Sequence, residues 1–167
     1  CRMLAAGEEP LYVVRRLIRF ASEDIGNADP QALLIAINAR NSYQTLGTPE
    51  GELALAQAVT YLATAPKSNA VYAAYNMVMQ DIRRTGSLPV PHHIRNAPTA
   101  LMKDLGYGKG YQYAHDDPHA LVDQHHLPEQ LQGTIYYQPT NRGYEAVIRD
   151  RLEKWRQPLR DRKKQSA

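Results

Sequence analysis

A glycine-rich stretch with one lysine, residues 106–111 (GYGKGY), is the first part of the sequence whose residue types could do chemistry. A phosphate-binding P-loop needs a longer spacing between its glycines, and a Ser or Thr after its lysine to hold magnesium. Here Gly110 follows Lys109, and no predicted strand precedes the stretch. The pattern therefore favours a tight turn over a nucleotide site. An alternative keeps Lys109 as a phosphate contact for nucleic acid, with neighbouring tyrosines stacking on bases.

Histidines gather in the second half of the sequence, where they could hold a metal ion. The candidate ligands are His115, Asp116, His119, His125 and His126, with the pair His92-His93 upstream. Pro118 argues against the helix that would place His115 and His119 on one face. The stretch contains no cysteine and no compact ligand signature. Surface or hydrogen-bonded histidines are the favoured interpretation, and a metal-dependent hydrolase built on this loop is the alternative.

Nucleophilic and acid–base catalysis find little support in the sequence. No serine lies in a nucleophile-elbow pattern, and Cys1 is the only cysteine. The adjacent carboxylates are typical of solvated acids near helix ends; they are Glu8-Glu9, Glu23-Asp24 and Asp116-Asp117. The sequence therefore predicts no catalytic residue and no bound cofactor or metal in this chain.

Positive charge is concentrated at the C-terminal end. The net charge is +3, but residues 142–167 hold nine Lys/Arg against four acids, so that residues 1–141 sum to −2. Such a tail could neutralise DNA phosphates. The favoured interpretation is a solvated face, since Asp150 and Lys154 have the favourable i,i+4 order.

Length and composition predict one globular domain. The chain has 167 residues with 43% hydrophobic and 22% charged side chains, and no apolar run approaches the roughly 20 residues that span a bilayer. A single cysteine fits a reducing cytoplasm. Residues 1–6 look like the last turns of a helix that Gly7 closes, so we expect further chain before them.

Four helices are predicted in the first half from their start and stop signals. They begin near Pro10, near Asp29-Pro30, near Thr48-Pro49 and near Ser68 or Asn69, and they end at Gly26, Gly47, Pro66 and Gly86. Because the turns between them are short, neighbouring helices should run antiparallel.

The second half has a different character. Residues 87–140 are rich in Gly, Pro, Tyr and His, with one short helix at 98–105. A final helix is expected at 141–157, capped by Thr140 or Asn141, until Pro158 ends or kinks it. Its inward residues should be Tyr144, Ile148, Leu152 and Trp155. The predicted fold is all-α: one domain over 1–157 with a helical core at about 8–86, a loop-rich segment at about 87–140, and a frayed basic tail at 158–167.

The fourth helix has an unusually broad apolar stripe. Val71, Tyr75, Val78 and Ile82 follow helical spacing, and Tyr72 and Met79 widen the stripe. A face this wide indicates contact on two sides. We expect self-contact on the second to fourth helices, with Tyr72, Tyr75 and Met79 as anchors, since buried aromatics and Met are favoured there. The alternative is that these three residues belong to the intramolecular core.

A DNA- or partner-protein-contacting module is a second candidate function. The possible phosphate contacts are Lys67, Arg95, Lys103 and Lys109, together with the basic tail. Steep salt dependence of DNA binding would favour this alternative.

Six stretches together resemble one protein family, in order from about Met3 to Trp155. They are residues 18–26 (IRFASEDIG), 29–32 (DPQA), 47–53 (GTPEGEL), 65–72 (APKSNAVY), 95–99 (RNAPT) and 106–115. This chain is similar to the C-terminal region of the replication-associated recombination protein A family, the bacterial relatives of the Werner-helicase-interacting ATPase.

The resemblance implies a larger protein than this chain. Family members are AAA+ ATPases related to clamp loaders, which act in replication-fork maintenance and recombination and bind ATP and Mg²⁺ in their N-terminal part. Their C-terminal part is a helical oligomerisation domain of a homotetramer. Members are linked to DNA and to the single-stranded DNA-binding protein, in the cytoplasm at the nucleoid and away from membranes. No ATP-site motif lies in this sequence, so no catalytic residue is carried over.

Overall fold

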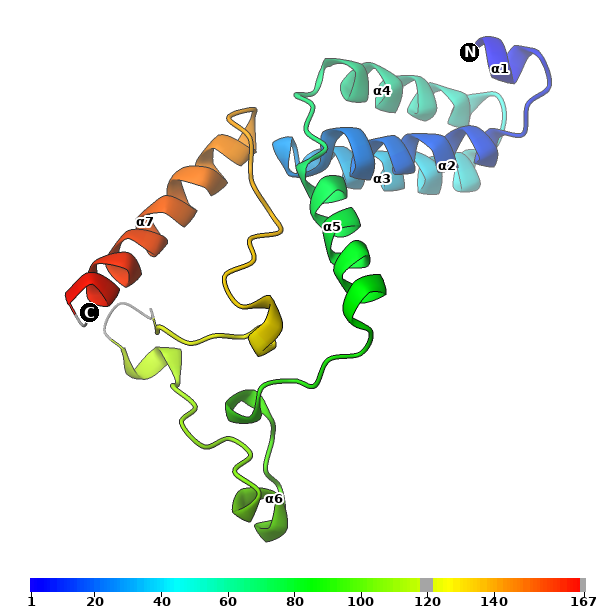
Figure 1. Ribbon diagram of the computed structural model, residues 1–167. Helices are drawn as coiled ribbons and strands as arrows, with labels where there is room; N and C mark the ends of the chain where they lie inside the picture. The colour runs from blue at the N-terminus through cyan, green and yellow to red at the C-terminus, as the bar shows by residue number, and fades with distance from the viewer. Residues whose placement is uncertain (118–121, 166–167) are drawn as a thin grey trace. The chain divides into compact units, whose positions relative to one another are not determined.

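The computed structural model describes residues 1–117 and 122–165 and confirms the all-α fold class, with no β-strand in those residues (Figure 1). Two units make up the chain: unit 1 is Cys1–Val78 with Tyr136–Asp150, and unit 2 is Met79–Ile135 with the chain from Arg151 onward. The single domain expected over 1–157 stays a prediction. The α-helices are α1 Arg2–Ala5, α2 Pro10–Phe20, α3 Gln31–Leu46, α4 Glu50–Thr64, α5 Ala70–Thr85, α6 Ala100–Asp104 and α7 Tyr144–Gln165.

The helix starts of unit 1 lie within about two residues of their predicted positions. Glu9 caps α2 by accepting hydrogen bonds from the amides of Leu11 and Tyr12, at 3.0 and 2.7 Å, just before Pro10 opens the helix. Asp29 Oδ1 accepts from the amide of Gln31 at 3.0 Å and so helps to start α3. These side chains satisfy amides that have no partner within the helix. Thr48 does not cap α4; its hydroxyl bonds the Tyr43 hydroxyl at 3.1 Å.

Helix α3 runs antiparallel to both α2 and α4, and the three helices enclose the core of unit 1 (Figure 1). Small side chains of α3 form the centre, because Ala32, Ala36 and Ala39 are all buried. Buried residues from neighbouring elements complete two clusters around them; α2 and α4 provide Val14, Leu55, Ala58 and Leu62, and the π-helical turn Ala21–Ile25 provides Ala21 and Ile25. Alanine at the contact lets the helices approach closely.

Several leucines of α3 and α4 lie outside this core. Leu34 and Leu46 of α3 are 53% and 58% exposed, and Leu53 of α4 is 76% exposed. Apolar side chains on the surface are ordinary when scattered singly, but grouped ones mark contact surfaces. The packing therefore uses the alanine face of α3 and leaves Leu34, Leu46 and Leu53 largely in solvent.

The segment Tyr136–Asp150 returns to unit 1 and docks through a glycine. Gly143 has φ +51°, and a Cβ placed there would lie 2.1 Å from the Ala28 carbonyl oxygen and 2.6 Å from Pro66 Cγ. No other residue fits a backbone contact this close. Gly143 thereby fixes where the chain enters α7.

Replacing Gly143 with alanine is expected to lower the free energy of unfolding by about 3 kcal/mol, because the added methyl group overlaps backbone atoms that cannot move independently. Gly47→Ala is the matched control: Gly47 also has positive φ, at +71°, but has open space around its Cβ position. The control should cost only the conformational strain, about 1 kcal/mol. If urea denaturation shows that Gly143→Ala and Gly47→Ala lower the free energy of unfolding equally, the close-packing explanation is contradicted.

Unit 2 contains the loop-rich segment that the sequence predicts. Short helical turns interrupt it at His92–Ile94, Ala114–Asp116 and Glu129–Leu131, and Thr99 caps the short helix α6. The last helix is longer than the predicted 141–157, since α7 runs from Tyr144 to Gln165 with Pro158 inside it. Tyr144 and Trp155, predicted to point inward, are 42% and 49% exposed, whereas Ile148 and Leu152 are half-buried.

Within residues 1–117 and 122–165, none of the helices combines the length and the apolar character that crossing a membrane requires.

Candidate functional site

The broad apolar stripe predicted on the fourth helix is exposed on α5. Tyr75 is 60% exposed, Tyr72 43% and Ile82 51%, while Met79 is half-buried. Ala70 is the only buried residue of this helix. We call Val71, Tyr72, Tyr75 and Met79 the α5 face. Tyr72 and Tyr75 thus lie mostly in solvent, and their role as anchors of self-contact stays a prediction.

Helical geometry places the residues of the α5 face on one side of the helix. Tyr75 follows Val71 by four residues and Met79 follows Tyr75 by four, so these side chains lie one above another along the helix. Tyr72 lies beside them, three residues before Tyr75. Exposed aromatics next to Met are the residue types enriched in protein–protein interfaces. The arrangement can bury apolar area against a partner without changing the fold of the chain.

The structure gives Lys67, one of the predicted phosphate contacts, a structural role. Its ammonium group donates to the carbonyl oxygens of Leu62 at 2.8 Å, Ala63 at 3.4 Å and Ala65. Nζ also lies 5.6 Å from the centre of the Phe20 ring. A cation at this position satisfies the unpaired carbonyls at the C-terminal end of α4 and complements the helix dipole.

Lys67→Met should therefore lower the free energy of unfolding by about 1 kcal/mol, because several carbonyl oxygens would then have no charged donor. Lys103, which is exposed on α6, provides the matched control, and Lys103→Met should leave stability unchanged within about 0.5 kcal/mol. Thermal or urea denaturation of the two variants measures the difference. Equal stability of both variants would mean that the contacts of Lys67 contribute nothing.

Arg95 is likewise engaged within its own unit. Its Nε donates to the Val90 carbonyl oxygen at 2.5 Å, and Nη1 donates to the Tyr107 hydroxyl at 3.2 Å. The guanidinium also lies 5.0 Å from the centre of the Tyr107 ring. His92 packs edge-on against the same ring. Lys103 and Lys109 remain exposed, whereas the charged groups of Lys67 and Arg95 are engaged within the chain.

The glycine-rich stretch at 106–111 is a turn, as predicted. The amides of Gly106, Tyr107 and Gly108 donate to the carbonyls of Lys103, Met102 and His92. Amides that are engaged in this way cannot cradle a phosphate group. The backbone thus gives no support to nucleotide binding in this stretch.

The predicted histidine-rich loop falls partly outside the described residues, since His119 lies there. Among the residues that are described, no three His, Cys, Asp or Glu side chains come together as metal ligands. His93 Nε2 instead lies 2.7 Å from the His125 carbonyl oxygen, and the His115 ring packs against Tyr113. These contacts connect parts of the loop to each other.

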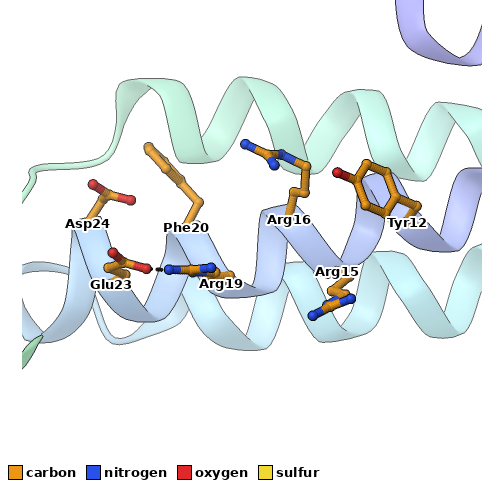
Figure 2. Close-up of a pocket in the computed structure, with 7 residues that line it drawn as sticks. All are labelled: Tyr12, Arg15, Arg16, Arg19, Phe20, Glu23 and Asp24. Atoms are coloured by element: carbon orange, nitrogen blue, oxygen red, sulfur yellow. Dashed lines mark hydrogen bonds and ion pairs between the residues drawn. The ribbon is translucent and has the colours of Figure 1, made fainter. Parts of the chain in front are cut away.

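A hollow on α2 that the sequence analysis did not single out has a volume of about 500 Å³. Figure 2 shows its side chains in two rows along the helix. One row is Tyr12, Arg16, Phe20 and Asp24, and the other is Arg15, Arg19 and Glu23. We call this set the α2 pocket. The spacing of four residues between successive members was a signal present in the sequence.

Some charged side chains of the α2 pocket form an ion pair and others do not. Arg19 Nε donates to Glu23 Oε2 at 2.7 Å, as the dashed line in Figure 2 marks. The hydrogen bond to Glu23 raises the pKa of Arg19, and the Glu23 charge adds to this effect. Arg15 and Arg16 are exposed, and neither has an ion-pair partner within the described parts of the chain. The guanidinium of Arg16 is therefore available to an anion.

Glu145, the second residue of α7, is a buried carboxylate that the sequence analysis also missed. It is 0% exposed and accepts four hydrogen bonds. The donors are the Ser68 hydroxyl at 2.7 Å, the Tyr137 hydroxyl at 2.9 Å, and the amide and hydroxyl of Thr140, both at 2.8 Å. Thr140 was a predicted cap of this helix, and it contacts the first turn through Glu145.

The pKa of Glu145 reflects two opposed causes. Burial raises the pKa, but the hydrogen bonds from Ser68, Thr140 and Tyr137 together outweigh burial, so the pKa lies below its ordinary value. For Tyr137, burial and the bond to Glu145 raise the pKa of the phenol, against the opposing effect of Asn27. Glu145 therefore stays ionised and joins the start of α7 to the residues that precede α5.

Comparison with known proteins agrees with the sequence resemblance. The model of the family described as MgsA AAA+ ATPase C terminal matches residues 1–156. "Replication-associated recombination protein A" of Coxiella burnetii is 56% identical over 158 residues, which cover 93% of this chain and 36% of the relative. The Escherichia coli K12 protein of the same name is 50% identical over 152 residues, covering 90% and 34%.

A eukaryotic relative extends the comparison. "ATPase WRNIP1" of Dictyostelium discoideum is 46% identical over 138 residues, which cover 82% of this chain and 16% of that protein. The chain spans about a third of the length of the two bacterial relatives. This chain thus belongs to the family of C-terminal regions of MgsA-type AAA+ ATPases.

Proposed function

We propose that this chain is the part of an AAA+ ATPase through which copies of the protein associate, forming a homotetramer. In this proposal the chain itself does no catalysis, and ATP and Mg²⁺ bind elsewhere in the whole protein. The tetramer arranges several ATPase modules around DNA. Symmetric self-association is the common way for a protein to multiply a site.

The α5 face is the observation that carries this proposal. It places Tyr75, Tyr72 and Val71 in solvent at 60%, 43% and 37% exposure, although each could bury substantial apolar area. The exposed leucines of α3 and α4 provide further apolar surface on unit 1. Two copies that cover these faces would remove them from water, with about 25 cal/mol gained for each Å² of apolar area.

The names of the relatives support the cellular role in this proposal. Two of them are called replication-associated recombination proteins, and a third is called an ATPase. We propose that the whole protein acts in replication-fork maintenance and recombination, in the cytoplasm at the nucleoid, with DNA and single-stranded DNA-binding protein as partners.

The mass of the chain in solution tests the proposal. Light scattering coupled to size exclusion, over a wide range of loading concentrations, should give a species of four times 18.8 kDa. The tetramer should dissociate only on strong dilution. A mass of 18.8 kDa at every concentration would refute the self-association function.

A further inference from the structure

The α2 pocket combines an aromatic ring that is open to solvent with a guanidinium one helical turn further along. Tyr12 is 40% exposed, and Arg16 follows it by four residues on the same row (Figure 2). Phe20, the next member of the row, is half-buried and has the Lys67 ammonium 5.6 Å from its ring centre. Tyr12 is therefore the ring in the row that can accept a stacked partner.

The arginines of the pocket differ in whether they are free to bind an anion. Arg19 already holds Glu23, whereas Arg16 and its neighbour Arg15 have no carboxylate partner among the residues that the structure describes. A free guanidinium binds phosphate oxygens through two parallel hydrogen bonds. An aromatic ring beside a free guanidinium is the combination by which proteins hold single-stranded nucleic acid, since every base has a face for stacking.

The position and size of the pocket fit such a ligand. A volume of about 500 Å³ lies within the range of small-molecule sites and has room for a nucleotide. The pocket ends at the π-helical turn Ala21–Ile25, a feature that often marks functional sites. Tyr12 at the other end offers an exposed ring for stacking, which the carboxylates of an acidic peptide would not use.

We infer that the α2 pocket binds one nucleotide unit of a single-stranded nucleic acid. The base stacks on Tyr12, and Arg16, assisted by Arg15, holds the adjacent phosphate. Duplex is disfavoured because its bases are already stacked on each other and cannot reach Tyr12. This site goes beyond self-association and does not depend on it. It also differs from the predicted contacts Lys67 and Arg95, whose charged groups are engaged within the chain.

The test measures binding of the 167-residue chain to a short fluorescein-labelled oligothymidine by anisotropy at several salt concentrations. Arg16→Ala should weaken binding about 5-fold or more and reduce the steepness of the log–log salt dependence by about 0.7 for each phosphate that is no longer neutralised. Tyr12→Ala should weaken it by a similar factor, whereas Tyr12→Phe should retain wild-type affinity because stacking is kept. Both positions are exposed, so the fold should survive.

Arg149→Ala is the matched control, since Arg149 is an exposed helical arginine of α7 and its removal changes the net charge equally. Its affinity should equal that of the wild type. Equal weakening by Arg16→Ala and Arg149→Ala would overturn the inference in favour of diffuse charge attraction. Absence of oligothymidine binding by the wild type would overturn it as well. Binding of poly-glutamate instead, abolished by Arg16→Ala, would assign the pocket to acidic peptides and also overturn it.

Repeating the titration with Tyr75→Asp separates this site from the proposed self-association. That substitution changes the α5 face and leaves the α2 pocket intact. The inference predicts unchanged affinity per chain for the oligothymidine, whatever the mass of the variant. A decrease in binding that follows the decrease in association would contradict an independent site on α2.

Discussion

Tyr75→Asp is expected to raise the dissociation constant for self-association at least about 30-fold, because a central aromatic anchor is removed and a charge must be buried in its place. Tyr75 is the most exposed aromatic residue of α5, at 60%. Since it contributes little to the fold of one copy, the melting temperature of the dissociated chain should change little. Sedimentation velocity across a dilution series measures the shift.

Tyr113→Asp is the matched control for this prediction. Tyr113 is 54% exposed and is not a member of the α5 face, and its replacement introduces the same change of charge and size. Its dissociation constant should stay within about 2-fold of the wild type, as expected for a surface substitution. If both variants weaken association equally, the α5 face does not form the interface.

Glu145→Gln is expected to lower the free energy of unfolding by about 3 kcal/mol at neutral pH, since one amide must replace a carboxylate that accepts four hydrogen bonds. If the one acceptor oxygen of the amide keeps the bonds from Ser68 and Thr140, its NH₂ group faces the Tyr137 hydroxyl, which then loses its acceptor. Glu153→Gln is the matched control on the exposed side of α7 and should change stability by less than about 0.5 kcal/mol. Urea denaturation of both variants gives the comparison.

The pH dependence of stability gives a second measurement on Glu145. Its pKa in the folded chain lies below the unfolded value of about 4.3. A group with this shift stabilises fully above the unfolded pKa and loses its contribution as the pH falls through the folded pKa. The stability difference between wild type and Glu145→Gln should therefore be constant near neutral pH and shrink below about pH 4.3. A difference that does not shrink in acid would show that the charge of Glu145 is not the cause.

The helices of the first half could be predicted because their signals are local. Each signal acts on its own turn of the backbone. Pro10 lacks an amide hydrogen, Asp29 caps with its carboxylate, and Gly47 adopts a positive φ. It was harder to predict which face of each helix is buried, because hydrophobic periodicity alone assigns the large apolar residues to the core. In α3 the close approach of its neighbours selects Ala32 and Ala36 for the core and leaves Leu34 outside.

The features that the sequence analysis missed depend on contacts between distant residues. Glu145 is recognisable only when Ser68, 77 residues earlier, lies against it. The charge of Lys67 could be predicted, but its use at the end of α4 depends on how the chain turns there. The α2 pocket is different, because the four-residue spacing of Tyr12, Arg16 and Phe20 can be seen in the sequence. The sequence does not show which of these side chains are exposed to solvent. For α7, the sequence predicts that Pro158 ends or kinks the helix, whereas the helix continues past it to Gln165.

Hydroxyl-radical footprinting at increasing protein concentration tests the central claim most directly, because it reports on the α5 face itself. Tyr72 and Tyr75 should lose reactivity as the mass of the particle rises, while Tyr12 and Tyr113, of comparable exposure, should react unchanged. Constant reactivity of Tyr72 and Tyr75 through a rise in mass would place the subunit contact elsewhere and contradict the account.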